Sequence, residues 1–216
     1  MAASKKKTTR NAALKETDAG LTPQVDLIYQ ALETEMGGVE IYTSALQCVQ
    51  DDDLREEWEE YLEQTKNHVE VLRELCEELG LDPDRETPGR QVVRHIGKSL
   101  VKAMQMAQGS GEPEAAEIVA AECVMLAETK DHSNWSLIGK LAEHGHDVNK
   151  QALQEAYDEV EDEEDEHLYH TRGWARELWL DALELPAQLP PPEEEEDVQS
   201  EEEALEVKKK SMAERG

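Results

Sequence analysis

Apolar residues recur along most of the chain at alternating spacings of three and four positions, which is the repeat of one face of an α-helix. This pattern predicts four long helices, over about residues 23–50, 51–79, 114–144 and 149–184. Thr22 followed by Pro23 is a typical helix start, because a threonine side chain caps free backbone N–H groups and proline suits the first helical position. Gly80 and Gly145 follow the second and third predicted helices, where glycine often ends a helix. The pattern indicates an all-α protein.

The connections between the predicted helices indicate how the helices pack. Residues 81–113 separate the second helix from the third and contain the amphipathic stretch GRQVVRHIGKSLVKAMQMA, which predicts an extra short helix. Short turns make consecutive helices antiparallel neighbours, whereas a connection of this length can cross a bundle. The expected fold is therefore a four-helix bundle with one long crossover between its second and third helices. This is the ferritin-like connectivity, in contrast to a simple up-and-down bundle.

Both ends of the chain lack the helical repeat. Residues 1–20 are polar and basic, whereas residues 186–216 are highly charged, low in complexity and acidic overall. Segments of such composition cannot bury enough apolar surface to offset the entropy lost on ordering. We therefore expect a disordered basic N-terminus over residues 1–20, the bundle over residues 21–185, and a disordered acidic tail over residues 186–216.

Composition and charge narrow the range of partners. The chain contains no Phe and has a formal net charge of −29. Nucleic acids and anionic membranes are themselves negatively charged, so this charge argues against both as partners. It is compatible with attraction of cations, and equally with solubility in a salty cytoplasm. No apolar run approaches the ~20 residues of a membrane-spanning helix, and no apolar segment follows the basic residues at the start, as it would in a secretory signal.

The three cysteines, Cys48, Cys76 and Cys123, lie within the helical pattern and lack the paired spacing of a zinc site. Reduced cysteines in a helical core are typical of cytoplasmic proteins. We therefore expect a cytoplasmic location, and we expect no thiol chemistry from these residues.

Polar residues interrupt the middle of each predicted apolar face. A single ionised carboxylate buried without a partner costs several kcal/mol. Interruptions at mid-helix in all four members of a bundle suggest that the side chains meet, and a divalent cation can then satisfy the acids while neutral histidines bind it. The interrupting residues are Glu35 in the first helix, His68 in the second, Glu128 in the third, and Glu164 with His167 in the fourth.

The fourth predicted helix carries the clearest local motif. Six acidic residues stand in a row from Glu161 to Glu166, and His167 follows. Glu164 and His167 are three positions apart, which places both on the same side of a helix. The alternative is that His167 and His170 are half-exposed residues beside a solvated acidic face, because so acidic a run places an acid near any histidine.

Several of these residues resemble those of rubrerythrins and other ferritin-like di-iron carboxylate proteins. Glu35 and Tyr42 are similar to the glutamate and tyrosine of the first helix of rubrerythrins. The stretch QTKNHVEVLRELCEELG resembles their second helix, with His68 at the ligand histidine. EEDEH resembles their fourth helix, with Glu164 as the bridging-type glutamate and His167 as its histidine. VKAMQMA and AAECVMLAE are also similar to stress-associated ferritin-like proteins.

The chain departs from this family at two expected carboxylates. Thr65 stands where the second helix of the family has glutamate, and Met125 stands at the first glutamate of the third-helix pair. The third helix instead offers Asp131 and His132 one turn beyond Glu128, and His132 lies four positions after Glu128, within reach of the same ion. The predicted metal ligands are Glu35, His68, Glu128, His132, Glu164 and His167, around one or two ions.

The resemblance, which covers residues 22–184, implies a metal-binding protein. Iron is the expected metal, with manganese or zinc as alternatives, because carboxylate and imidazole ligands suit all three. Bound iron would imply oxidation of Fe(II) by oxygen or peroxide, in oxidative stress or iron handling, by an oxidoreductase of the di-iron type. No CxxC pair follows the fourth helix, so an electron donor would be external. Assembly of several copies is possible.

Two rival interpretations remain open. In the first, Thr65 and Met125 mark a lost site, and a metal-free helical bundle acts by association as a stress-related structural protein. In the second, the acidic tail docks basic partners and the bundle is a scaffold.

Two glycines stand in the middle of the first predicted helix. Gly37 and Gly38 each cost a helix about 1 kcal/mol relative to alanine. No strand precedes them, so they do not form a phosphate-binding loop. We expect them to permit a close approach of another helix.

Overall fold

The protein is described by a computed structural model, which covers residues 21–146, 149–196, 198 and 200–214. The expected disordered segment at residues 1–20 lies outside this range. The described residues form helices and contain no strand. The helices are α1 (Pro23–Ala45), α2 (Asp52–Leu79), α3 (Pro88–Gln108), α4 (Pro113–His144), α5 (Lys150–Ala182), α6 (Pro192–Glu195) and α7 (Glu201–Glu214).

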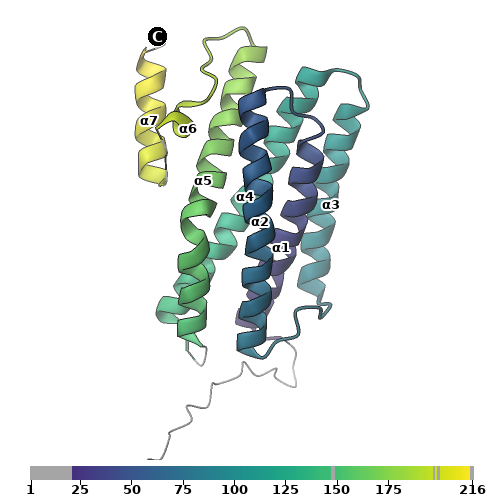
Figure 1. The fold of residues 1–216 in the computed structure, drawn as a ribbon, viewed down its shortest axis with the longest axis vertical. Coiled ribbons are helices and arrows are strands. Elements are labelled where there is room, and N and C mark those ends of the chain that lie inside the picture. The colour runs from purple at the N-terminus through teal and green to yellow at the C-terminus, as the bar shows by residue number, and fades with distance from the viewer. Residues whose placement is uncertain (1–20, 147–148, 197, 199, 215–216) are drawn as a thin grey trace, which may run out of the picture.

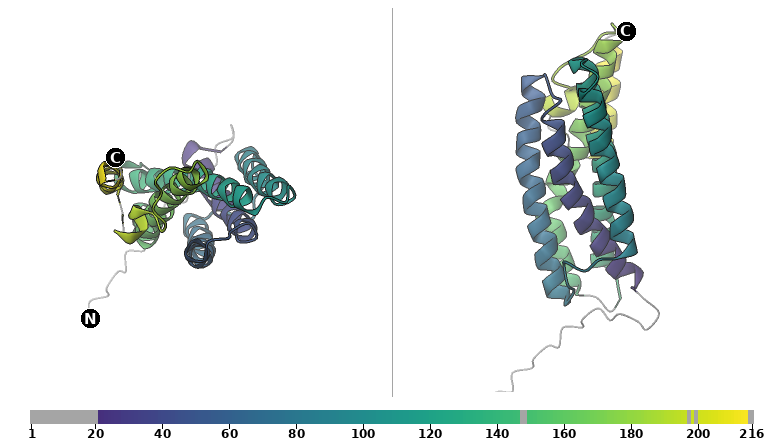
Figure 2. Two further views of the ribbon diagram at one scale, coloured as in Figure 1. Left: turned by 90° about the horizontal axis from the view of Figure 1, so that it is seen from above. Right: turned by 90° about the vertical axis from the view of Figure 1, so that its right-hand side faces the viewer.

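The five long helices lie side by side along one axis (Figure 1). Helices α1 and α2 form an antiparallel pair, and α4 and α5 form a second pair. Along the chain, α3 follows the first pair and precedes the second. It runs back from one end of the molecule to the other, so that α2 and α4 run in the same direction. The connection contains the predicted extra helix over almost the predicted stretch, and with 21 residues this helix is nearly as long as α1. Helix α3 packs against α1 and α4 (Figure 2).

The helix ends follow the local sequence. The Thr22 side chain accepts a hydrogen bond from the backbone N–H of Val25, and the Asp51 side chain accepts bonds from the first turn of α2. Gly80 ends α2 with φ 72°, a left-handed conformation that glycine adopts without strain. Helix α1 ends at Ala45, before the predicted end near residue 50, because the chain turns at Leu46 to reach the start of α2.

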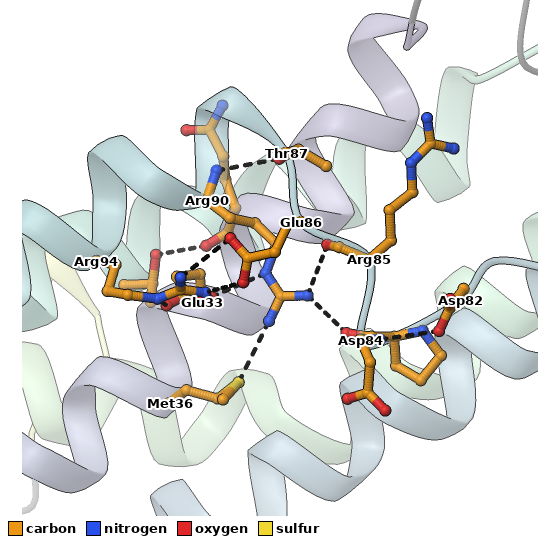
Figure 3. Close-up of polar contacts among 12 residues, drawn as sticks. Glu33, Met36, Asp82, Asp84, Arg85, Glu86, Thr87, Arg90 and Arg94 are labelled. Carbon is orange, nitrogen blue, oxygen red and sulfur yellow. Dashed lines mark hydrogen bonds and ion pairs between the residues drawn. The ribbon is translucent and has the colours of Figure 1, made fainter.

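A buried ion-pair network attaches α3 to α1 (Figure 3). Arg90 of α3 and Glu33 of α1 are both buried, and Arg90 Nε lies 2.8 Å from Glu33 Oε2. Arg94 adds two bonds to the same carboxylate, of 2.5 and 2.9 Å, and reaches outward to Glu86. The other guanidinium nitrogens of Arg90 donate to the carbonyl oxygens of Pro83 and Arg85 and contact the sulfur of Met36.

The core consists of two apolar layers with a polar layer between them. The layer at the end where α1 begins includes Ile28, Leu32, Leu72, Trp135 and Leu153. The layer at the other end includes Tyr42, Trp58, Val124 and Trp174. The polar interruptions that the sequence shows at mid-helix lie between these two layers, so apolar packing continues above and below them.

Residues 186–216 contain α6 and α7, where the sequence analysis expects a disordered tail. Arg176 of α5 holds α6 by a two-point ion pair with Glu193, with distances of 2.6 and 2.7 Å. Val198 and Val207 are buried against Leu168 and Tyr169 of α5. Within α7, Ala204 and Val207 stand three positions apart and both pack in this cluster, which average composition does not reveal.

No helix in the described part of the chain combines the length and the apolar composition that crossing a lipid bilayer requires.

The ion-pair network gives a prediction about stability. Replacing Glu33 with alanine leaves the buried Arg90 guanidinium without its carboxylate, which should lower the free energy of unfolding by about 3–5 kcal/mol. The measurement is urea denaturation followed by circular dichroism. Glu86→Ala is the matched control, because it removes an exposed carboxylate from the same Arg94 and should change stability little. Equal effects of the two substitutions would contradict the assigned role of Glu33.

Candidate metal centre

The polar layer brings together side chains from α1, α2, α4 and α5. Each of these four helices contributes at the depth where its apolar face is interrupted, and every contributing residue is at most 4% exposed. Five of the six predicted site residues lie here, and one acid that was not in the predicted set joins them. The six residues are Glu35 on α1, His68 on α2, Glu128 and Asp131 on α4, and Glu164 and His167 on α5.

The two imidazole rings hold the cluster together. His68 Nδ1 lies 3.1 Å from Glu164 Oε1 and 3.4 Å from Glu35 Oε1. His167 Nδ1 lies 3.7 Å from Glu128 Oε2 and 3.9 Å from Glu164 Oε1. The rings themselves stack with their centroids 5.6 Å apart. Both Nδ1 atoms therefore face the carboxylates, and Glu164 is near both of them.

The cluster contains two overlapping sets of potential ligands. His68, Glu164 and His167 form one set, and Glu35, Asp131 and Glu164 form the other; within each set the ligand atoms lie within 4.8 Å of one another. Three donors at this separation can hold a metal ion. Because Glu164 belongs to both sets, its two oxygens can serve two neighbouring ions.

Unpartnered polar atoms provide an independent test of whether the site fits a cation. Buried polar atoms in proteins almost always have hydrogen-bond partners, yet six in this cluster have none, one from each residue. A cation would satisfy all six, because each is a carboxylate oxygen or an imidazole nitrogen. The atoms are Glu35 Oε2, His68 Nδ1, Glu128 Oε2, Asp131 Oδ1, Glu164 Oε2 and His167 Nδ1. The residues present therefore fit a bound metal.

Residues around the cluster fix the orientation of both histidines. His68 Nε2 lies 2.7 Å from Glu163 Oε2, and His167 Nε2 lies 2.8 Å from Gln64 Oε1. A carboxylate and an amide oxygen only accept, so each Nε2 carries the proton and each Nδ1 can present a lone pair to a metal. Partners of this kind typically orient metal-binding histidines. No pattern in the sequence marks Glu163 or Gln64 for this role.

Crowding of buried acids shifts the pKa values of the cluster. Burial, with the nearby charge of Glu35, raises the pKa of Glu164 to about 7. Burial and the charges of Glu35, Glu164 and Glu128 raise the pKa of Asp131 well above its usual value. Burial alone would lower the pKa of His68, but the Glu35 charge, the bond to Glu163 and the Glu164 carboxylate beside Nδ1 outweigh it, and the result is a raised pKa. Without a cation, protons must therefore offset part of the buried negative charge.

The pKa of His167 is raised for similar reasons. Burial lowers this pKa, but Glu128 and Glu164 raise it by more.

Tyr42, which resembles the tyrosine of the first rubrerythrin helix, is fully buried with its ring 6.1 Å from that of His167. Burial and the charge of Glu128 raise the pKa of Tyr42 well above its usual value, so its phenol stays protonated at neutral pH.

His132 lies apart from the cluster, contrary to the expectation that it reaches the same ion as Glu128. Its Nε2 lies 2.7 Å from Asp165 Oδ1, and its side chain is 30% exposed. Asp131, the preceding residue, turns inward in its place. The sequence contained the signal for this assignment, because Asp131 falls on the apolar face that runs from Val124 through Trp135, whereas His132 does not.

The two departures from the family pattern add no ligand here. Thr65 is buried and donates from its hydroxyl to the backbone carbonyl oxygen of Tyr61 at 2.7 Å. Met125 is half-buried beside the apolar layer near the start of α4. On α2 the cluster therefore receives one imidazole and no carboxylate.

The pKa shifts predict how the metal-free protein responds to pH. The folded chain holds protons on Glu164 and Asp131, and on both cluster histidines, that the unfolded chain releases near ~4 for the acids and ~6.5 for histidine. These groups therefore contribute stability at low pH that is lost as pH rises through their folded-state pKa values. The free energy of unfolding of chelator-treated protein should fall between about pH 5.5 and pH 8.

Urea denaturation across this range measures the effect. Glu164→Gln removes one of the four groups, so the fall with pH should be smaller in this variant. A stability that rises with pH equally in both proteins would contradict the shifts.

Comparisons of the chain with known protein families, with curated protein sequences and with solved structures find no match. The geometry of the cluster is therefore the basis on which a function is inferred.

Proposed function

We propose that this chain is a ferritin-like metal-binding protein that holds one or two divalent ions between α1, α2, α4 and α5. Iron is the first candidate, with manganese or zinc as alternatives. The observation that carries this proposal is the set of six buried, unpartnered donor atoms that converge from four helices. Proteins rarely leave one such atom unpaired, and a divalent cation is a partner that all six could share.

The charge of the cluster favours two ions. Four carboxylates carry four negative charges when all are ionised, and two divalent cations supply four positive charges. Neutral histidines then complete the site without adding charge. A single divalent ion would leave two negative charges or require two retained protons, which is costly in a buried layer. The position of Glu164 in both ligand sets supports the same stoichiometry.

The ligand types favour a hard or borderline metal. All donors are carboxylate oxygens and imidazole nitrogens, which suit iron, manganese and zinc, whereas soft metals prefer thiolates. The three cysteines are buried elsewhere and belong to neither ligand set. On α4, Glu128 and Asp131 stand three positions apart, so they supply an acidic pair of the kind that the third helix of the resembling family carries.

Bound iron would supply redox chemistry, in which dioxygen or peroxide accepts electrons from Fe(II). The residues around it would have three tasks. The carboxylates neutralise the cations, Glu163 and Gln64 keep the histidine lone pairs directed inward, and the apolar layers above and below exclude water. An external donor would return the electrons, since neither ligand set contains a second redox group.

Metal content tests the proposal directly. Protein purified with Fe(II), Mn(II) or Zn(II) should contain about two ions per chain for at least one of these metals. His167→Ala removes a ligand of one set and should release at least one ion. The measurement is elemental analysis after gel filtration. Protein that takes up none of the three metals would overturn the proposal and favour the metal-free bundle that acts by association.

Matched variants separate ligands from neighbours. His132→Ala should keep the full metal content, because this histidine faces Asp165. Glu163→Ala should weaken metal affinity by about 10–100-fold, the usual effect of removing a residue that orients a ligand. Asp162→Ala, an exposed acid one position away, should have no comparable effect.

The redox part of the proposal has its own test. Metal-free protein mixed with Fe(II) in air should oxidise it at least about tenfold faster than buffer alone, and Glu164→Ala should lose this advantage. Loss of Fe(II) is followed with a colorimetric chelator, with His132→Ala as the control variant. Normal metal uptake without faster oxidation would remove the redox function and leave the metal site.

A further inference from the structure

A second feature lies on the other side of α1 and α4 from the candidate metal centre. An apolar slot of about 210 Å³ runs between α1, α3 and α4. Helix α1 presents Thr34 and α4 presents Ala127 to it, and each is the chain neighbour of a residue in the metal cluster that faces the opposite way. The slot and the metal centre are thus separate sites that share two helix walls.

Gly37 helps to create this space. A Cβ atom added at Gly37 would meet nothing within 4 Å, whereas one added at Gly38 would come within 3.0 Å of Thr65 Cγ2. Gly38 therefore permits the close packing of α2 against α1 that we expected from this pair of glycines. Gly37 has no such role, because a side chain there would not meet α2. A glycine inside a helix costs about 1 kcal/mol, and at Gly37 no packing contact explains it. The residue leaves the wall of the slot open.

The slot is apolar at one end and polar at the other. Helices α1 and α3 run in the same direction and α4 runs opposite to them (Figure 1). Near the start of α1 the lining includes three polar residues, Glu33, Thr34 and Lys130, together with Val93 of α3. The residues toward the end of α1 are apolar, namely Ile41, Leu100 and Leu126. A molecule that matches the slot has one polar end and an apolar body.

The charge at the polar end is positive. The Glu33 carboxylate is engaged by both Arg90 and Arg94, as Figure 3 shows, so it presents no uncompensated negative charge. Lys130 is half-buried, and its Nζ bonds to the amide oxygen of Asn134; no acid in the described part of the chain lies within 4 Å of it. In a chain of net charge −29, a lysine that forms no close ion pair at the end of an apolar slot favours an anion.

We propose that this slot binds a small amphiphile with a carboxylate head, which lies beside Lys130, and an unbranched apolar tail, which extends past Gly37 toward Ile41 and Leu100. A carboxylate can accept a hydrogen bond from the Lys130 ammonium, which has hydrogens left after its bond to Asn134. The tail removes the surfaces of Ile96 and Leu126 from water, which are 49% and 55% exposed. The volume lies below the 300–1,000 Å³ of typical drug-sized sites, which fits a short or medium chain.

The proposal is tested with octanoate and its uncharged counterpart, octanol, by isothermal titration of the full chain with and without metal. Octanoate should bind at one site per chain, more tightly than octanol. Binding should strengthen about tenfold from hexanoate to octanoate, because two more methylene groups become buried. The metal state of the protein should leave octanoate binding largely unchanged, which separates this result from that of the metal proposal.

Four variants locate the binding. Gly37→Leu places a side chain into the slot and should weaken octanoate binding at least tenfold, whereas Gly37→Ala should retain most of it. Lys130→Gln should weaken octanoate binding about tenfold while octanol binding stays the same. Lys102→Gln, an exposed lysine of α3 that lies outside the slot lining, should behave like the wild type. Thermal melts verify that each variant is folded.

Three outcomes would overturn the proposal. The first is the absence of octanoate binding at millimolar concentration. The second is binding that survives both Gly37→Leu and Lys130→Gln, because the ligand would then lie elsewhere. The third is a dimer in solution that Ile96→Glu dissociates and that excludes octanoate, because the slot would then be an interface between two copies of the chain.

Discussion

The cost of burying charge in a helical core governs this structure. Four carboxylates and two imidazoles lie at one level between helices that are otherwise packed through apolar side chains. Water cannot solvate them there, and their separations are too short for all of the acids to be ionised without compensation. Protons or cations must therefore accompany the fold. This requirement links stability and pH in one site, and the proposed binding of metal would be linked to both.

The rest of the bundle places apolar layers on both sides of the charged level. Apolar residues above and below the charged level supply the packing that stabilises the helices, so the polar residues need not contribute to it. The attachment of α3 to α1 also depends on compensation of a buried charge. Arg90 can be buried because Glu33 and two carbonyl oxygens surround it. In both places a buried charge has partners from an element far away in the sequence, which fixes how the elements pack.

Much of the fold could be predicted from the sequence, because the apolar repeat locates the four long helices and the interruptions locate the charged layer. Asp131 lies on the same helical face as Val124 and Trp135, and His132 does not, so the spacing already favoured Asp131 as the inward residue. The spacing of four positions from Glu128 to His132 suggested the wrong ligand. Glu163 and Gln64 act from neighbouring turns on other helices, and only tertiary packing brings them to the histidines. The slot beside Gly37 could not be predicted from the sequence either. A glycine in a helix is compatible both with close approach of another helix and with empty space.

The bond between His68 and Glu163 has a consequence for the rate at which the buried layer responds to its surroundings. His68 is fully buried, yet its outer nitrogen meets a carboxylate whose side chain is 36% exposed. A single side chain thus spans the distance from the charged interior to bulk water. Rotation of an exposed side chain takes picoseconds to nanoseconds, whereas separation of packed helices is far slower. Protons can therefore leave or enter the core while the bundle stays closed.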